Sequence, residues 1–246
     1  MYKILEKLKE VGLEHYFRPK WYSIFINPYF IARYSLFKKI NKFSKQHNWL
    51  NKNILDVGCG IKPYESLFKG AYYVGIDIEG GGHKDEKKKI DILFDGKNIP
   101  FDEKSFDLII CTQVLEHTLD YEYLLKEMYR VLKDDGILLI TAPLVWNEHE
   151  IPYDFFRFTK FAYKEIFSKI GFKIITIQPT TTFFATIGQL LSAFLVEMLS
   201  YNKIILKIII SLIFCFPVQI LFLFLDLLFK SHWLTLDYFV IARKIR

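Results

Sequence analysis

Cysteine is scarce in this chain, and its few positions exclude two classes of small protein. The three cysteines, Cys59, Cys111 and Cys215, follow no regular spacing. They therefore predict neither a disulfide framework nor a cysteine-based zinc site, and a reducing, cytoplasmic setting is expected. An apolar run is also missing behind the charged residues at positions 3–9, so we expect no signal peptide there.

Charge and hydrophobicity are unevenly distributed along the 246 residues. The hydrophobic content is 52% and the mean hydropathy is +0.17, and most of this excess lies after Thr180. Residues 1–50 hold ten Lys and Arg against three Asp and Glu, whereas residues 51–179 hold 17 against 21. A basic flank and an apolar segment favour an anionic membrane surface over nucleic acid as a partner. A solvated basic face is an equally weighted alternative.

From residue 53 onward, short apolar strands alternate with helices. The strands are expected at residues 53–57, 72–77, 90–94, 106–112, 137–142, 172–178 and 237–243, and the helices at 64–68, 121–132 and 160–170. This alternation predicts a parallel, doubly wound sheet. We expect Gly136 to end the helix 121–132, because glycine takes a positive φ at little cost.

The N-terminal residues have a different pattern. Residues 2–18 have a helical period, and the aromatic segment 21–43 predicts one or two further helices. This segment could form a lid over a pocket or a surface that lies on lipid. A helical cap over the sheet is slightly favoured. A charged, glycine-containing loop is expected at residues 80–89.

A glycine-rich turn after the first strand carries the strongest functional signal. The segment Gly58–Gly60 offers backbone against which a ligand can lie. Dinucleotide-binding enzymes also use such a turn, but their fingerprint needs a third glycine where this chain has Pro63. Asp56 precedes the turn and can hold a cationic group. Asp77 ends the second strand and can accept both ribose hydroxyls.

Further segments follow this turn in a fixed order. They are Leu55–Gly60, Val74–Asp77, Phe94–Phe101, Ser105–Cys111, Val114–His117 and Val131–Gly136. Together they resemble the class I S-adenosylmethionine-dependent methyltransferases, in particular the methyltransferase type 11 group. The resemblance covers about residues 50–180 and the final strand. It implies a Rossmann-like, mostly parallel, seven-stranded sheet, S-adenosyl-L-methionine as cofactor and methyl transfer as the reaction.

The resemblance also assigns residues to the cofactor. Those implied to bind it are Asp56, Gly58, Cys59, Gly60, Asp77, Asp95, Gly96 and Gln113. Asp56 would help to hold the amino group of the methionine part, which lies against the glycines. Asp77 would hold the ribose hydroxyls. Asp95 would reach the adenine amino group beside the backbone of Gly96, and Gln113 would lie near the transfer site.

The acceptor side is expected after the fifth strand, at the sheet edge where ligands bind. Segment 146–159 is similar to the His-x-x-x-Tyr-Asp-x-x-Arg-Tyr/Phe-Thr pattern of relatives linked to cell-surface sugars and lipids. His149 is the expected catalytic base, because its ordinary pKa lies near neutral pH. Tyr153, Asp154 and Arg157 are expected to shape the acceptor pocket. A folded loop in which Arg157 pairs with Asp154 is weighted only slightly lower.

No metal ligands are expected. Glu148, His149 and Glu150 are adjacent, and three consecutive side chains do not easily converge on one ion. His117, which follows Glu116, is expected to support the floor of the cofactor site.

Two long apolar runs lie between the sixth and seventh strands. Residues 183–199 are apolar apart from Gln189 and Glu197, and residues 208–225 carry no charge. The second run is a borderline membrane span by length. Because the flanking strands must pair in one sheet, the chain has to return to the same side of any bilayer. That condition allows no spans, two spans or a dipping hairpin.

The second run favours a monotopic arrangement. Pro217 near its middle suits a re-entrant hairpin or an in-plane helix pair. Lys203, Lys207 and Lys230 flank the runs and could meet lipid phosphates. A soluble helical subdomain or a dimer interface is the alternative, and membrane association is favoured over it.

These expectations define three regions and one function. Residues 1–50 form a helical cap, residues 51–180 and 235–246 bind the cofactor, and residues 181–234 form the apolar insertion. The expected enzyme methylates an oxygen or nitrogen atom of a lipid-linked, glycan or quinone-like acceptor at the cytoplasmic face of a membrane. A membrane-docked, non-catalytic adaptor with this fold is the first alternative. A nicotinamide-dependent oxidoreductase is a second one, disfavoured by Pro63 and Asp95.

Overall fold

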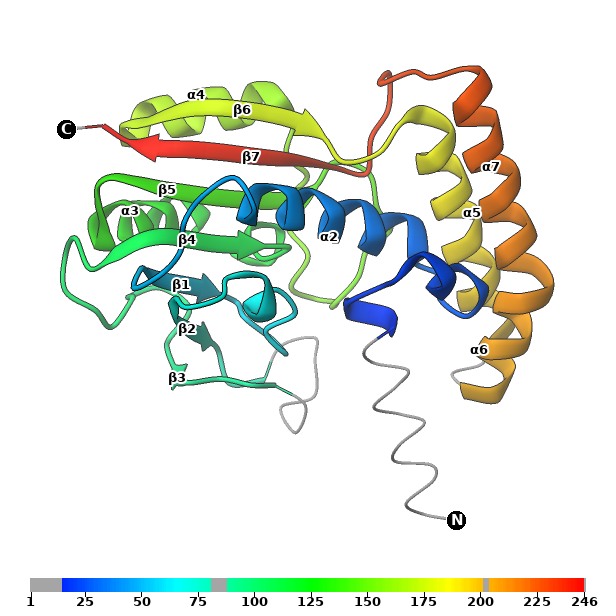
Figure 1. Cartoon of the computed structure of the whole chain (residues 1–246), viewed down its shortest axis with the longest axis horizontal. Coiled ribbons are helices and arrows are strands. Elements are labelled where there is room, and N and C mark those ends of the chain that lie inside the picture. The colour runs from blue at the N-terminus through cyan, green and yellow to red at the C-terminus, as the bar shows by residue number, and fades with distance from the viewer. Residues whose placement is uncertain (1–14, 81–87, 201–203, 246) are drawn as a thin grey trace, which may run out of the picture. The chain divides into compact units, whose positions relative to one another are not determined.

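The computed structural model describes residues 15–80, 88–200 and 204–245 (Figure 1). Most of the helix expected at residues 2–18, much of the loop expected at 80–89 and Lys203 lie outside these residues. The chain divides into two compact units. Residues 43–178 and 237–246 form the first, here called the sheet unit. Residues 1–42 and 179–236 form the second, here called the helical unit.

A seven-stranded sheet with the order β3-β2-β1-β4-β5-β7-β6 forms the centre of the sheet unit. Its strands are β1 (Asn53–Val57), β2 (Tyr72–Asp77), β3 (Ile92–Leu93), β4 (Phe106–Thr112), β5 (Leu132–Pro143), β6 (Phe172–Pro179) and β7 (Asp237–Lys244). The pairs from β3 to β5 are parallel, and β7 runs antiparallel to β5. The expected Rossmann-like, mostly parallel sheet is confirmed, as is the helical insertion between strands 6 and 7.

Two helices cover one face of this sheet. These are α3 (Tyr121–Val131) and α4 (Lys160–Ile170). The hydroxyl of Thr159 accepts a hydrogen bond from the N–H of Ala162 and so caps α4, and Gly171 ends it at a φ of 104°. Leu125 of α3 and Phe167 of α4 are fully buried with the central strands in one apolar core. This core gives the strand ends a rigid support.

Three local expectations differ from the structure. A single 3-10 turn, η2 (Glu65–Leu67), stands where the helix 64–68 was expected. Strand β3 keeps only two residues. The positive φ expected at Gly136 is wrong, because α3 ends at Val131 and Asp135 takes the positive φ. Gly136 is needed for another reason: a Cβ there would lie 2.7 Å from Leu132 Cγ.

The helical unit contains the insertion and part of the N-terminal region. Its elements are η1 (Trp21–Phe25), most of α2 (Phe30–Ser44), α5 (Phe183–Ser200), α6 (Ile204–Ile210), the π-helical turn η5 (Ser211–Cys215) and α7 (Phe216–Leu228). The last three form one continuous helix that runs beside α5 (Figure 1). Pro217 lacks an N–H group, and the π turn directly before it accommodates the break in the hydrogen-bond ladder.

Both ends of the insertion are tied together within the helical unit. The N–H of Phe183 donates to the carbonyl oxygen of Ser231 at 2.8 Å, and the N–H of Thr181 donates to the hydroxyl of Thr235 at 3.1 Å. The chain therefore leaves the insertion beside the place where it entered. This geometry agrees with the argument that the insertion returns to its starting side.

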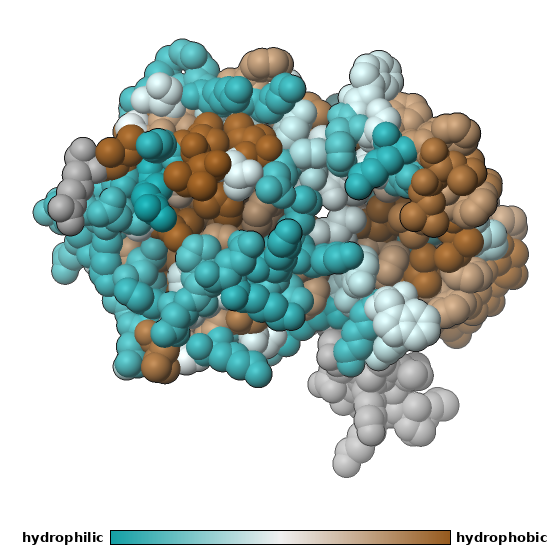
Figure 2. Space-filling model, turned by 45° about the horizontal axis from the view of Figure 1, so that its top comes forward, coloured by the Kyte–Doolittle hydropathy of each residue, from teal (hydrophilic) through white to brown (hydrophobic). Residues whose placement is uncertain are grey.

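The helical unit places polar side chains inside and apolar side chains outside. Gln189 is fully buried and bonds to Pro28 O and to the N–H of Ala32, both at 3.0 Å. Gln219 is also buried and donates to Asn27 O. Large apolar side chains lie exposed on α5 to α7, as Figure 2 shows; they include Phe194, Met198, Ile213, Leu221, Phe224 and Leu227. The boundaries 1–50 and 181–234 remain a proposal.

Candidate functional site

The glycine turn after β1 is tight on one side and open on the other. Gly58 has a φ of 68°, and a Cβ there would lie 2.3 Å from Val114 Cγ2, which follows β4. Gly60 has a φ of 49°, and a Cβ there would meet nothing within 4 Å. A side chain at Gly58 would therefore push the two strand ends apart, whereas Gly60 borders free space that a ligand can fill.

Asp77 at the end of β2 is linked directly to this turn. One carboxylate oxygen accepts a hydrogen bond from the N–H of Gly60 at 2.8 Å, and the other accepts one from the N–H of Ile78 at 2.8 Å. The ammonium group of Lys88 lies 3.5 Å from the second oxygen. Each carboxylate oxygen can accept more than one hydrogen bond. Asp77 can therefore still accept from a ligand hydroxyl.

Asp56 and Cys59 lie deeper, beneath the turn. The hydroxyl of Tyr73 donates to the Asp56 carboxylate at 2.6 Å, and burial raises the pKa of Asp56 to about 7. The Cys59 side chain is buried, and a Cβ on Gly75 would lie 2.7 Å from its Sγ. Gly75 is thus required so that the turn can pack against β2.

The expected adenine loop follows β3. The Asp95 carboxylate accepts hydrogen bonds from the N–H of Lys97 and of Asn98 at 2.8 and 2.7 Å. These bonds, together with one from the Asn98 amide, lower the pKa of Asp95. Gly96 has a φ of 79°, and a Cβ there would lie 3.2 Å from Ile78. Asp95 thus holds the turn that brings Gly96 close to Asp77 and its neighbour, and its contact with adenine stays a prediction.

Gln113 follows β4 in a left-handed conformation with a φ of 57°. Its side-chain amide donates to the Thr141 hydroxyl at 3.1 Å and to the Asp237 carboxylate at 3.2 Å. These bonds direct the amide along the ends of β5 and β7. Its role near the transfer site stays a prediction.

The segment after β5 folds around Asp154. Arg157 donates two hydrogen bonds to this carboxylate, at 2.6 and 2.7 Å, and the N–H of His149 donates a third at 3.0 Å. The His149 Nδ1 atom lies 3.1 Å from the same carboxylate. The folded-loop pairing of Arg157 with Asp154 is present. It also fixes the orientation of the His149 ring.

Backbone hydrogen bonds join this segment to the turn after β4. The N–H of Phe155 donates to the carbonyl oxygen of Glu116 at 2.8 Å. His117 Nδ1 lies 2.7 Å from the carbonyl oxygen of Tyr153, while the Tyr153 side chain is 60% exposed. Tyr153 therefore contributes its backbone here and leaves its phenol at the rim.

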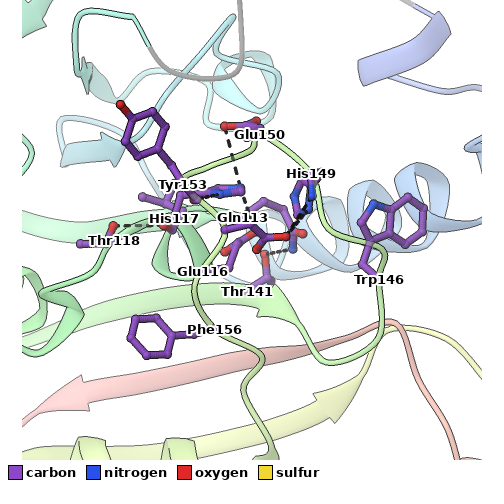
Figure 3. Close-up of polar contacts among 12 residues, drawn as sticks. Gln113, Glu116, His117, Thr118, Thr141, Trp146, His149, Glu150, Tyr153 and Phe156 are labelled. Carbon is purple, nitrogen blue, oxygen red and sulfur yellow. Dashed lines mark hydrogen bonds and ion pairs between the residues drawn. The ribbon is translucent and has the colours of Figure 1, made fainter.

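These bonds gather Glu116, His117 and His149 into one cluster (Figure 3). One ligand atom of each lies within 4.8 Å of the others. The two imidazole rings meet edge to face with their centroids 4.7 Å apart. Glu116 is completely buried, which raises the pKa of its carboxyl well above the usual range. Sequence reasoning assigned Glu116 no part in this cluster, because 33 residues separate it from His149.

Comparisons with known proteins agree with this arrangement. A family model described as a methyltransferase domain matches residues 30–177, more than half of the chain. The ubiquinone biosynthesis O-methyltransferase of Pelagibacter ubique is 34% identical over 103 residues, which cover 37% of this chain and 42% of that protein. An uncharacterized protein of Methanocaldococcus jannaschii is 31% identical over 141 residues, which cover 55% of this chain and 60% of that protein. The match therefore spans about half the length of these relatives.

A solved structure shares the fold. Phosphoethanolamine N-methyltransferase 2 of Haemonchus contortus, in complex with S-adenosyl-L-methionine, matches with a TM-score of 0.55 at 17% identity. The match covers 96% of this chain and 60% of that one.

The pairing of Asp154 with Arg157 predicts a pH-dependent contribution to stability. The two hydrogen bonds from Arg157 hold the pKa of Asp154 well below its usual value of about 4. Its stabilisation is therefore complete above that value and is lost as the pH falls below it. We expect Asp154→Asn to lower the free energy of unfolding at pH 7 by about 1–3 kcal/mol, and by less at pH 3.

Urea unfolding of both proteins between pH 7 and pH 3 checks this. The exposed Asp102, substituted as Asp102→Asn, is the control and should stay within about 0.5 kcal/mol of the parent. A difference between the parent and Asp154→Asn that does not change with pH would show that the pair contributes nothing through its charge.

Proposed function

Because this chain belongs to the methyltransferase-domain family, whose cofactor is S-adenosyl-L-methionine, we propose that it methylates an oxygen atom of a lipid-linked, quinone-like or glycan acceptor at the cytoplasmic face of a membrane. The observation that carries the proposal is the pairing of Asp77 with the Gly60 turn, beside the free space at Gly60. A nitrogen acceptor is the less favoured form of the same proposal.

The turn and its neighbours fit the cofactor. The methionine part would lie over Gly58 and Gly60, where no side chain intervenes, and Asp77 would accept the ribose hydroxyls. Gly96 would offer backbone to the adenine ring. When bound, the cofactor supplies an electrophilic methyl group on its sulfonium. Because this group is already reactive, the protein contributes chiefly by aligning an acceptor atom with it.

The acceptor side supports an oxygen acceptor. A hydroxyl must lose its proton to become a good nucleophile, and a positioned histidine assists that loss. The Asp154 carboxylate takes the Nδ1–H of His149 and leaves Nε2 as the atom available to an acceptor. We therefore assign His149 as the group that activates the hydroxyl, with Asp154 and Arg157 as positioning residues. The name of the Pelagibacter relative, a ubiquinone biosynthesis O-methyltransferase, favours a quinone-like ring.

The helical unit supports a lipid-soluble acceptor. Only 22% of the window Ile205–Leu228 is buried, although its mean hydropathy is 2.8. A core helix of a soluble protein would bury most of such a window, and exposed apolar patches of this extent mark membrane or protein contacts. Buried Gln189 and Gln219 beneath an apolar exterior are the arrangement that a lipid environment favours. Trp233, 82% exposed, and Lys230 beside it suit the interface with headgroups.

Cofactor binding tests the core of the proposal. We expect isothermal titration to show micromolar binding of S-adenosylhomocysteine to the parent, weakened roughly 10- to 100-fold in Asp77→Asn, because a charged hydrogen-bond acceptor is lost. Asp120→Asn is the matched control, since Asp120 precedes α3 without capping it through its side chain. A folded parent that does not bind would overturn the proposal and favour the non-catalytic adaptor.

Flotation with vesicles tests the membrane contact. We expect the full chain to float with vesicles that contain phosphatidylglycerol. The double variant Leu221→Glu/Phe224→Glu should remain at the bottom, because two charges would enter the apolar surface. Leu119→Glu, at a 70% exposed position of the sheet unit, should float like the parent. A parent that stays in solution as a stable dimer would contradict the membrane proposal and favour a dimer interface.

A further inference from the structure

Glu116 has a carboxyl group whose surroundings do not satisfy it. The residue is 0% exposed, and neither Oε1 nor Oε2 has a hydrogen-bond partner among the described residues. A buried charge without a partner costs several kcal/mol. Protonation removes the charge but adds an O–H that needs an acceptor. A bound ligand that neutralises the carboxylate resolves both problems.

His117 offers a nitrogen to the same point. Its Nδ1 atom lies 2.7 Å from the carbonyl oxygen of Tyr153, which can only accept, so the ring proton is on Nδ1. The Nε2 atom then carries a lone pair. It lies 3.8 Å from Glu116 Oε1. Two negative or lone-pair atoms that face each other at this distance need a cation between them.

His149 repeats this arrangement from the other segment. Its Nδ1 atom faces the Asp154 carboxylate, which two hydrogen bonds from Arg157 hold in place. A histidine that gives one ring N–H to a carboxylate and leaves the other nitrogen unprotonated is the usual form of a metal-ligating histidine. Both histidines of the cluster therefore have the supported ring orientation that metal sites show.

We propose that Glu116, His117 and His149 bind a divalent cation of the zinc type. Two imidazole nitrogens and one carboxylate are a known ligand set for catalytic zinc, with the fourth position left to water or substrate. The ligand atoms lie within 4.8 Å of one another, and a tetrahedral site needs separations of about 3.3 Å. Small side-chain rotations close this gap. Glu150, whose Oε2 lies 3.9 Å from His117 Nε2, adds negative charge beside the site.

This inference rests on the proposed function for its purpose and not for its test. In the proposed reaction, the acceptor hydroxyl would fill the fourth position of the cation. A bound cation lowers the pKa of such an oxygen, so the hydroxyl would release its proton to solvent water and face the methyl group as an oxyanion. His149 would then activate the acceptor through the cation that it ligates. The acceptors that fit are ring or chain hydroxyls.

Metal binding to the full chain tests the proposal directly. The protein is stripped with dipicolinate and titrated with Zn²⁺ in competition with a chromophoric chelator. Co²⁺ serves as a second probe, because tetrahedral coordination gives it strong visible absorption. We expect one equivalent of Zn²⁺ to bind with submicromolar affinity. Glu116→Gln and His149→Ala should each weaken binding roughly a hundredfold or more.

His232→Ala is the matched control, because His232 is exposed in the helical unit and should leave binding unchanged. Circular dichroism checks that each variant is folded. His149 is partly exposed, so its variant keeps the test open if Glu116→Gln fails to fold. Binding that His149→Ala leaves unchanged, or binding no tighter than that of a histidine tag alone, would overturn the proposal.

Titration with S-adenosylhomocysteine separates this result from the proposed function. A protein that binds S-adenosylhomocysteine but no Zn²⁺ would reject the cation site alone. A protein that binds Zn²⁺ but no S-adenosylhomocysteine would reject the methyltransferase proposal alone.

Discussion

The hydrogen bond from the N–H of Phe155 to the carbonyl oxygen of Glu116 is the constraint on which the candidate site depends. It ties the segment after β5 to the turn after β4. The parallel order of these strands already brings their carboxyl ends to one edge of the sheet. The bond then fixes which residues meet there, and it sets His149 beside Glu116 and His117. Arg157 and Asp154 hold the far side of the same segment in place.

The two halves of the site use the chain in different ways. On the cofactor side, backbone atoms dominate, because Gly60 and Gly96 leave space and Asp77 holds the turn by accepting N–H groups. On the acceptor side, charged and titratable side chains dominate. This division suits a reaction in which one substrate is always the same and is held by its shape. The other substrate is selected and activated by side chains.

The sequence predicted the cofactor half well, because its signals are local. Residues 53–60 and 72–77 read as strands that end in a turn and an acid, and both strands have the predicted bounds. The cluster of Glu116 with His149 was beyond such reasoning, because it depends on a backbone hydrogen bond between segments far apart in the chain. Gly136 was misjudged for a related reason, since its neighbour Leu132, and not its own φ, demands glycine.

Transfer of a labelled methyl group from S-adenosylmethionine to a lipid extract tests the central claim most directly. The extract should come from the cells that make this protein, and the enzyme should be the full chain with vesicles present. The account predicts that label enters the organic phase as an ether that mild alkali does not cleave. Label that stays in the aqueous phase, with a protein that binds S-adenosylhomocysteine, would contradict methylation of a membrane-resident hydroxyl.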